Sequence, residues 1–597
     1  MQARRVMAMD HVAACRLPLR LPTLRLGRPG EVAFALVLGE AHSCSSANCL
    51  GGPFMASASF SALVKSYLDE RYEESPTWAS ILGLTEYDER STDLSAEAFR
   101  RRDARVLEWT RRFRSAVDAE LAPNERIDRD VVLASLRGRE LLQPREEWRR
   151  QPSVYLNPSL QGVFTLFLHR LRPERELADA ARARLEAVPE QIGHGKANLD
   201  LPNAPRVYID RAIGQAKAAA RYARDLVPAE VKDASLRERL AGAGAVAGAA
   251  YEDFAAFLGG NKERATGDYA IGADLYTALL KDSELLPYDA RELRERGEEQ
   301  YELLSAEANR IAEDIDGSGD WVKTCATLNR VHAPTPEAMR AEYEAWTEKA
   351  RTFLRETGLV TLPAGERCSV EPSPLFQRPI LAVASYNAPP AFSDSRHGHF
   401  FVPYPPDGTP PEEVQKRLEG NSSAGIPTTA VHEAYPGHHW HLVMAKANPS
   451  PIRRTHWTSY FGEGWALYAE RVMREQGFFT DPRQLIFQYE ATLFRAARIV
   501  VDVGLHSGEM TFEQAVDFMT EKGNLTPPNA RAEVGRYCSW PTQASSYLTG
   551  MLEIVDIRTR WLARKGSSDR AALREFHDAI TSTGSIPTTL AERAIAA

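Results

Sequence analysis

The densest group of chemically active side chains lies in residues 428–441, which read TTAVHEAYPGHHWH. Four histidines and one glutamate fall within this stretch, although the whole chain of 597 residues has only 14 histidines. The stretch is close to H-E-x-x-H, in which two histidines on one helical face share a zinc ion and the glutamate polarises water. Position 436 is proline, so the second histidine of that motif is missing from its usual place.

The spacing of the later histidines decides whether they can share a metal with His432. On an unbroken helix, His438 would be rotated by about 240° from His432, because each residue turns by about 100°. His439 would return to the same face, but roughly 10 Å further along the axis. Pro436 and Gly437 favour a break in the helix, since proline removes a backbone donor and glycine permits unusual backbone angles. We predict that the break brings His438 back beside His432, with His439 as the alternative second ligand.

A third ligand is expected from the helix that GEGWALYAERVMREQG, residues 462–477, predicts. Glu463 lies near the start of this helix, and two histidines, a glutamate and one open position form a standard catalytic zinc set. Glu470 follows seven residues later on the same face and is expected to orient a ligand histidine. We predict one Zn²⁺ per chain, held by His432, His438 and Glu463, with Glu433 as general base. A structural metal site and a histidine cluster without metal are the alternatives.

Hydrolysis at such a site also needs a hydrogen-bond donor for the oxyanion of the tetrahedral intermediate. The stretch RYCSWPTQASSYLTG, residues 536–550, offers candidates for this role. We predict Tyr547 as the donor, with Tyr537 as second choice, while packing as an ordinary helical aromatic is the alternative for each. Arg536 and Tyr537 are assigned to substrate binding, because a guanidinium group matches the geometry of a substrate carboxylate.

The elements around these residues are predominantly helical. Apolar residues recur at three- and four-residue spacing from about 57 to 355 and again from 428 to the end. Pro427 with Thr428 and Thr429 predicts a helix that begins there, with a threonine as N-cap. Residues 362–411 are rich in proline and aromatics and predict short strands at Ile380–Ser385 and His399–Val402. The fold class is therefore mainly α, with a small β or loop insert before the metal-binding helix. In that insert, His397 and His399 are predicted to be solvated loop residues, with substrate contact as the alternative.

Composition describes an ordinary globular protein of more than one subdomain. The chain is 43% hydrophobic and 26% charged, and its net charge of -8 argues against nucleic acid as the main partner. We find no apolar run of about 18 residues, so no membrane partner is expected. The six cysteines are sparse and lack a C-x-x-C pair, which fits free thiols in a reducing compartment.

The first 54 residues differ from the rest, with six arginines and a short apolar run that is a poor signal peptide. We predict a disordered or mis-assigned extension at 1–54, a helical subdomain at 55–360 and a catalytic subdomain at 361–597. A cytoplasmic location is predicted, with export as the alternative. Oligomeric state cannot be predicted from the sequence.

Several of these stretches together resemble the bacterial DUF885 proteins, whose hallmark is H-E-x-x-P-G-H-H. The resemblance runs from about 60 to 595 and is most specific in HEAYPGHH, residues 432–439, and FGEGWALYAE, residues 461–470. That family is similar to helical zinc peptidases of the angiotensin-converting and thermostable carboxypeptidase groups. The resemblance implies a multi-helix shell around a deep cleft and a zinc metallopeptidase site, but no substrate. This chain departs from the family pattern in its first 54 residues and at Gly535, where an acidic or polar residue is more usual.

Together these observations predict a zinc-dependent hydrolase that cleaves amide bonds in short peptides. The first alternative is a metal-dependent amidohydrolase that acts on a small non-peptide amide. The second is a non-catalytic helical binding protein whose metal site is structural.

Overall fold

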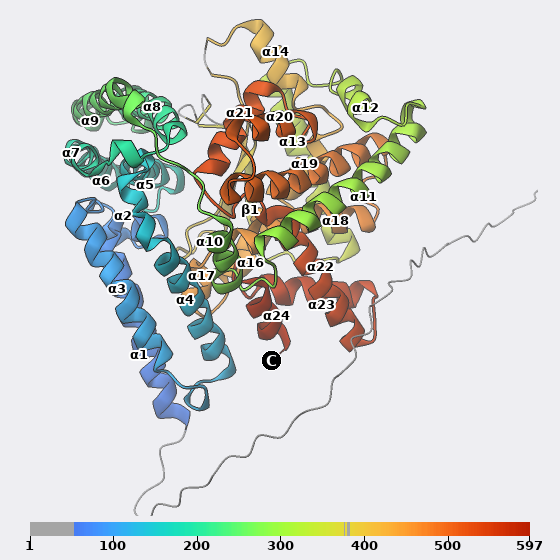
Figure 1. Ribbon diagram of the computed structural model, residues 1–597, viewed down its shortest axis with the longest axis horizontal. Helices are drawn as coiled ribbons and strands as arrows, with labels where there is room; N and C mark the ends of the chain where they lie inside the picture. Colours follow the sequence, from blue (N-terminus) through green and yellow to red (C-terminus); the bar gives the residue numbers. More distant parts are fainter. Residues whose placement is uncertain (1–52, 375–376, 379–382, 407, 597) are drawn as a thin grey trace, which may run out of the picture. The chain divides into compact units, whose positions relative to one another are not determined.

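A computed structural model describes residues 53–374, 377–378, 383–406 and 408–596 (Figure 1). The described residues form one compact unit. The extension predicted at 1–54 lies almost entirely outside the described residues.

The first part of the described chain consists of helices, as the apolar spacing predicts. Ser95 caps the helix that follows it by accepting a hydrogen bond from the Ala98 amide at 3.2 Å, and Thr335 caps another in the same way. The elements are α1 (Pro53–Glu74), α2 (Pro76–Ile81), α3 (Ala96–Arg114), α4 (Pro123–Leu142), α5 (Asn157–His169), α6 (Glu174–Glu186), α7 (Val188–Asn198), α8 (Arg206–Arg221), α9 (Ala234–Asn261), α10 (Ala273–Ala278), α11 (Ala290–Asp316), α12 (Trp321–Leu328) and α13 (Pro336–Thr357).

A small mixed sheet follows in the insert before the histidine cluster. It consists of β1 (Arg367–Pro372), β2 (Ser385–Asn387) and β3 (His397–Val402), in the order β1-β3-β2. β1 pairs parallel to β3, and β2 pairs antiparallel to it. The sequence predicts β3 but misses its first two residues and all of β1. The other predicted strand overlaps β2 only at Ser385, and residues 379–382 lie outside the described part.

The last part of the chain is helical again. Its elements are α14 (Pro411–Glu419), α15 (Ile426–Glu433), α16 (His438–Lys446), α17 (Pro451–Thr455), α18 (Ser459–Glu475), α19 (Pro482–Ser507), α20 (Phe512–Glu521), α21 (Pro527–Cys538), α22 (Ser546–Lys565), α23 (Arg570–Thr581) and α24 (Thr588–Ala596). The fold is therefore mainly α with one small sheet, which confirms the predicted fold class.

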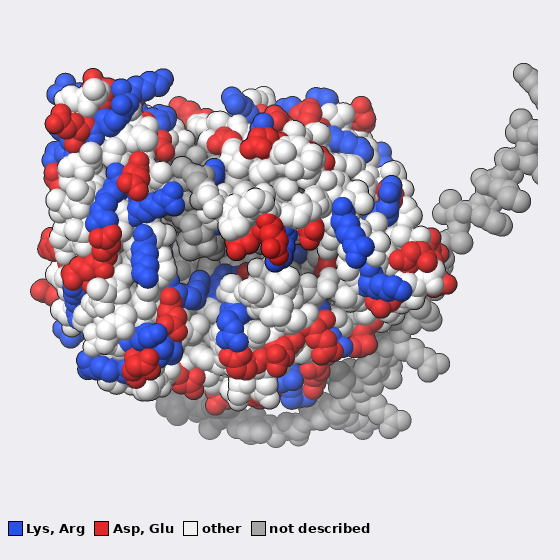
Figure 2. Space-filling view, turned by 90° about the horizontal axis from the view of Figure 1, so that it is seen from above, with Lys and Arg blue, Asp and Glu red and all other residues white. Residues whose placement is uncertain are grey.

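Two hydrophobic cores hold these elements together. The main core runs from Phe60 to Ala591 and draws on residues on both sides of position 360, where the sequence predicts a subdomain boundary. The second core is built by residues 156–265, which span α5 to α9, with Phe401 of β3 added from the sheet. Figure 2 shows that the face seen from above is hollowed beside the lobe that α8 and α9 form in Figure 1. The deep cleft implied by the family resemblance stays a prediction.

Candidate metal centre

The histidine cluster lies where one helix ends and the next begins. α15 ends at Glu433 and α16 starts at His438, so His432 and Glu433 occupy the last turn of a short helix. The helix starts one residue before the predicted Pro427, at Ile426, and the prediction of a threonine N-cap is wrong, because the N-cap is Gly425.

The interruption between the two helices is held by specific contacts. The Gly437 amide donates to the Val431 carbonyl at 3.1 Å, and the Trp465 indole donates to the Pro436 carbonyl at 2.8 Å. The bond between Tyr435 and Pro436 is cis. Gly437 has φ −69° and ψ −136°, a combination outside the helical and extended regions, as the sequence suggests for a glycine at a helix break. A β-carbon at 437 would overlap the carbonyl oxygens of His432 and Val431, so only glycine permits this close approach.

This break brings His432 and His438 together with Glu463. The two imidazole rings are perpendicular, with their centres 4.9 Å apart. The Nε2 atoms of His432 and His438 lie 3.7 and 3.3 Å from the same Glu463 carboxylate oxygen. One ligand atom from each of the three residues lies within 4.8 Å of the others, which is the spacing expected around one metal ion.

His439 faces away from this group. Its Nε2 atom lies 2.9 Å from a Glu366 carboxylate oxygen, and its Nδ1 atom lies 2.8 Å from the Tyr386 hydroxyl. Glu366 also accepts hydrogen bonds from Tyr435 and Arg351. Of the two candidates for the second histidine, His438 is therefore the one that the structure brings to His432 and Glu463.

α18 supplies both carboxylates that contact His432. The His432 Nδ1 atom lies 2.7 Å from a Glu470 carboxylate oxygen. Glu470 follows Glu463 by about two turns on the same face of the helix, as the seven-residue spacing predicts. α18 can approach α22 closely because Gly464 and Gly550 face each other. A β-carbon on Gly464 would overlap the Gly550 backbone, and one on Gly550 would overlap the Tyr460 carbonyl. Because α18 and α22 cross so closely, the first turn of α22 lies near Glu463 of α18.

The electrostatics of the centre favour a bound cation. Burial opposes a charge on His432, but hydrogen bonds to Glu463 and Glu470 outweigh it and raise its pKa to about 9. Burial would raise the pKa of Glu463, but His438 and His432 hold that pKa well below its ordinary value. The carboxylates thus make a negatively charged site that stabilises positive charge, either on the imidazoles or on a metal ion between them.

Glu433 lies beside the triad without being one of its members. Its side chain is buried, and burial raises its pKa, while the positive charges of His432 and His438 act in the opposite direction. Arg495 of α19 also lies close enough to lower this pKa. A carboxylate with a raised pKa next to metal-ligand candidates is suited to accept and return a proton near neutral pH.

Tyr547 is the predicted oxyanion donor, and the structure places it in the first turn of α22. Glu463 contributes to raising its pKa, after burial, so the phenol lies within electrostatic reach of the triad. Its hydroxyl accepts a hydrogen bond from Gln543 at 3.3 Å, which leaves the hydroxyl proton able to donate to another group. Tyr547 therefore has a proton free to donate, and its role as oxyanion donor stays a prediction.

Arg536 and Tyr537 are held by protein partners. Arg536 donates to Gln543 and, at 3.0 Å, to Glu533. The Tyr537 hydroxyl donates to Glu533 at 2.7 Å and accepts from Arg498 at 2.9 Å. Their substrate-binding roles stay predictions. In the structure, Arg536 orients Gln543, which in turn holds Tyr547.

Some residues of the site escape sequence reasoning. Glu366 lies far upstream in a stretch with no motif, yet it orients His439 beside the centre. Arg495 lies in the middle of α19, where a helical arginine is usually a surface residue. Its Nη1 atom donates to the Ala491 carbonyl at 3.0 Å, and within the described part of the chain no carboxylate lies within 4 Å of its guanidinium nitrogens. A guanidinium near the centre without such a partner is able to accept an anionic group.

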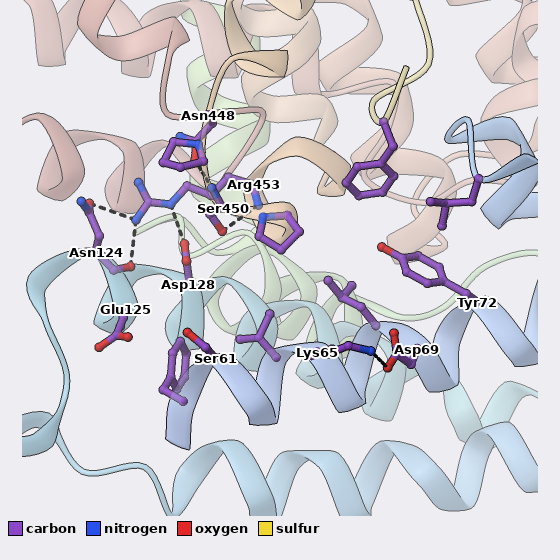
Figure 3. Close-up of a pocket in the computed structure, with 17 residues that line it drawn as sticks. Ser61, Lys65, Asp69, Tyr72, Asn124, Glu125, Asp128, Asn448, Ser450 and Arg453 are labelled. Atoms are coloured by element: carbon purple, nitrogen blue, oxygen red, sulfur yellow. Dashed lines mark hydrogen bonds and ion pairs between the residues drawn. The ribbon is translucent and has the colours of Figure 1, made fainter. Parts of the chain in front are cut away.

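A separate cavity of about 550 Å³ lies between α1, α4 and α17 (Figure 3). Its walls are largely apolar, and none of the triad residues lines it. Arg453 donates to Asp128 at 2.6 Å and to Asn124, so the main charged groups of this cavity satisfy one another. The cavity has no arrangement of groups suited to hydrolysis.

Comparison with known proteins identifies the family of this chain. Residues 76–595 match the model of a family described as "Bacterial protein of unknown function (DUF885)". The chain belongs to the DUF885 family. The match includes the helix break, the triad, Glu433 and Tyr547, so the family assignment covers the whole candidate centre of this DUF885 chain. The resemblance that the sequence motifs indicate is thereby confirmed.

Two solved structures share the fold. One is described as a "putative lipoprotein of unknown function" from Shewanella oneidensis, with a TM-score of 0.70, 20% identity and coverage of 90% of this chain and 100% of that one. The other is described as a "putative lipoprotein" from Colwellia psychrerythraea, with a TM-score of 0.76, 20% identity and coverage of 91% and 98%. At this identity the similarity establishes the fold alone. Among curated proteins, none gives a significant match to this sequence.

None of the helices in the described part of the DUF885 chain combines the length and the apolar character that a membrane span requires. Cys325, Cys368 and Cys538 are free thiols.

Proposed function

We propose that this DUF885 protein is a zinc-dependent hydrolase that cleaves amide bonds in short peptides. The observation that carries the proposal is the convergence of His432, His438 and Glu463 on one point with the buried carboxylate of Glu433 beside it. A metal site that only supports the fold has no use for an adjacent base, and three protein ligands with an open fourth position are the catalytic pattern.

The residues present fit a zinc ion. Both imidazoles direct Nε2 to the same side of the Glu463 carboxylate, and Glu470 fixes the orientation of His432 through Nδ1. When bound there, zinc supplies Lewis-acid polarisation of the substrate carbonyl and of water. Two imidazoles and one carboxylate also suit manganese, cobalt or iron. We propose zinc because this ligand set with an open position is a standard catalytic zinc site.

The chain's own groups divide the remaining work. Glu433 takes a proton from the attacking water and returns it to the leaving amine, for which a buried carboxylate with a raised pKa is suited. Tyr547 donates its hydroxyl proton to the oxyanion, while Gln543 keeps the phenol in place. Arg495 offers positive charge to an anionic group of the substrate, such as a peptide carboxylate.

Replacing Glu433 with glutamine tests this division of roles. Glu433→Gln preserves the shape of the side chain but removes the proton acceptor, so hydrolysis of a short-peptide library should fall by about 10²- to 10⁴-fold. Metal content should stay equal to that of the wild type, because Glu433 is not a ligand. Wild-type cleavage by the variant would refute the mechanism. Turnover of a small amide without any peptide cleavage would favour the amidohydrolase alternative.

We propose a cytoplasmic location from the sparse cysteines, of which the three in the described part of the chain are free thiols. The lipoprotein descriptions of the two structural relatives make export the competing proposal. Cell fractionation combined with mass spectrometry of the mature N-terminus distinguishes the two, since an exported form carries a processed terminus.

A further inference from the structure

A second group of two histidines and a glutamate lies on the small sheet. His397 and His399 alternate along β3 and therefore point to the same face. Glu371 lies on β1, which pairs parallel with β3, so that its side chain reaches the same face. One ligand atom from each of these three residues lies within 4.8 Å of the others.

The contacts within this group, which we call the sheet cluster, orient its side chains. His399 Nδ1 lies 3.0 Å from a Glu371 carboxylate oxygen, and His397 Nε2 lies 2.6 Å from the Ser369 hydroxyl. The two imidazole centres are 4.4 Å apart. His399 is buried, whereas the Glu371 side chain is 37% exposed, so an ion has a route from solvent. The sequence prediction that His397 and His399 are solvated loop residues is wrong, because His397 already belongs to β3 and His399, at the predicted start of that strand, is buried.

The sheet cluster is separate from the centre at His432. Gly398 lies between the two histidines and faces the other way, since a β-carbon there would overlap the Tyr386 hydroxyl and press on His439. His439 in turn is the neighbour of the predicted ligand His438. One face of the sheet therefore points towards His439 and the centre at His432, and the opposite face holds the sheet cluster.

We propose that Glu371, His397 and His399 bind a second divalent metal ion of the zinc class. Imidazole nitrogens and a carboxylate oxygen are both common zinc ligands, and the three leave a fourth position for water. The residues flanking His397 and His399 in sequence are Arg396, Gly398 and Phe400, so no carboxylate stands where Glu433 stands in the first centre. The ion at the sheet cluster is structural.

Its position explains what such an ion stabilises. The imidazole of His169, the last residue of α5, packs against His399 with ring centres 5.7 Å apart. Two residues further along β3, Phe401 packs against Phe164 of α5 with centres 6.2 Å apart, and Phe401 belongs to the second core. An ion that ties β1 to β3 therefore fixes the strand on which α5 and the second core rest.

Counting metal ions per chain tests the proposal. The full chain is incubated with zinc sulfate and desalted, and zinc is measured by elemental analysis, together with the Tm before and after chelation. Two zinc ions per chain are expected in the wild type, and one in the double variant His397→Ala/His399→Ala. Glu371→Gln, which keeps the size of a half-exposed side chain, should weaken the second zinc at least 10-fold and reduce the chelator-induced drop in Tm.

His194→Ala is the matched control. His194 also lies near a glutamate, 3.6 Å from Glu190, but among the described residues it belongs to no group of three metal-ligand candidates, so this variant should retain two zinc ions. One zinc in the wild type and the same one in the double variant would overturn the proposal, as would two zinc ions that both variants of the sheet cluster retain. The first centre is tested apart by His432→Ala. A zinc ion lost in the sheet variants but never in His432→Ala would support the sheet cluster and refute the proposed function.

Discussion

The centre at His432 and the sheet cluster at His397 hold the same three kinds of side chain on different backbones. In the first, a helix break brings two histidines together and a second helix supplies Glu463. In the second, alternation along one strand does the same, and the neighbouring strand supplies Glu371. A strand needs no special residue to align positions i and i+2, whereas a helix needs Gly437 to align positions i and i+6.

The surroundings differ more than the ligands do. His432 is buried, bonds a second carboxylate through Nδ1 and has Glu433 as its sequence neighbour. His397 has a serine hydroxyl as its partner and an arginine and a glycine as its neighbours. The same metal-ligand set therefore predicts chemistry in one place and structural support in the other, and the difference lies in the groups beside the ligands.

The largest difference between the two regions is expected when a methyl group is added at Gly437 or at Gly398, the closely packed glycine of each region. In Gly437→Ala the new β-carbon meets helix carbonyls that cannot move, so the free energy of unfolding should fall by about 3 kcal/mol or more. In Gly398→Ala it meets the ends of the Tyr386 and His439 side chains, which can shift, and a loss of about 1 to 3 kcal/mol is expected. Urea unfolding measures both. Equal losses would show that the helix break is not the more demanding of the two.

Removing the second carboxylate from His432 tests whether the first centre owes its metal affinity to more than three ligands. Glu470→Gln should weaken zinc binding by about 10- to 100-fold, because it replaces the charged carboxylate that orients the imidazole with a neutral amide, a weaker acceptor. A competition titration with a chromophoric chelator measures the change. Glu475→Gln on the same helix is the control, since Glu475 pairs with Arg471 and Arg558 instead. Equal affinities in the two variants would remove Glu470 from the centre.

The network behind Tyr547 belongs to the first region only, and it predicts an acid-sensitive contribution to stability. Burial would raise the pKa of Glu533, but Arg498, Arg536 and Tyr537 outweigh burial and hold the pKa well below its ordinary value. Such a carboxylate stabilises the fold above its unfolded pKa of about 4.3, and this contribution is lost as the pH falls towards the folded pKa.

The free energy of unfolding should therefore fall below pH 4.3 by up to about 1.4 kcal/mol per pH unit from this group, and less steeply in Glu533→Gln. Denaturant titrations at pH 5, 4 and 3 measure the slopes. Glu521→Gln, at an exposed position on α20, should keep the wild-type slope. Parallel slopes for the wild type and Glu533→Gln would contradict the low pKa.

Much of the first centre could be predicted from sequence because its signals are local. Histidine spacing around Pro436 and Gly437 indicates the break, and the seven-residue interval on α18 places Glu463 and Glu470 on one face. What local patterns cannot give is the partner of each group across the fold. The Glu366 contact to His439 and the closeness of Arg495 to Glu433 depend on tertiary packing alone.

The strand pairing of the small sheet could not be predicted from local sequence patterns. Proline and aromatic residues in 362–411 signal an interruption of the helices, but not which segments pair. β1 contains arginine, cysteine, glutamate and proline and has no alternating apolar pattern, so only pairing with β3 makes it a strand. The sheet cluster was missed for the same reason, since Glu371 reaches the histidines only through that pairing.

The central claim is that the helix break assembles a catalytic metal centre from His432, His438 and Glu463. Zinc content and peptide cleavage, measured together on the wild type and His432→Ala, test it most directly. We expect His432→Ala to lose one zinc ion per chain and all detectable cleavage. A His432→Ala protein with the zinc content and cleavage of the wild type would contradict the claim.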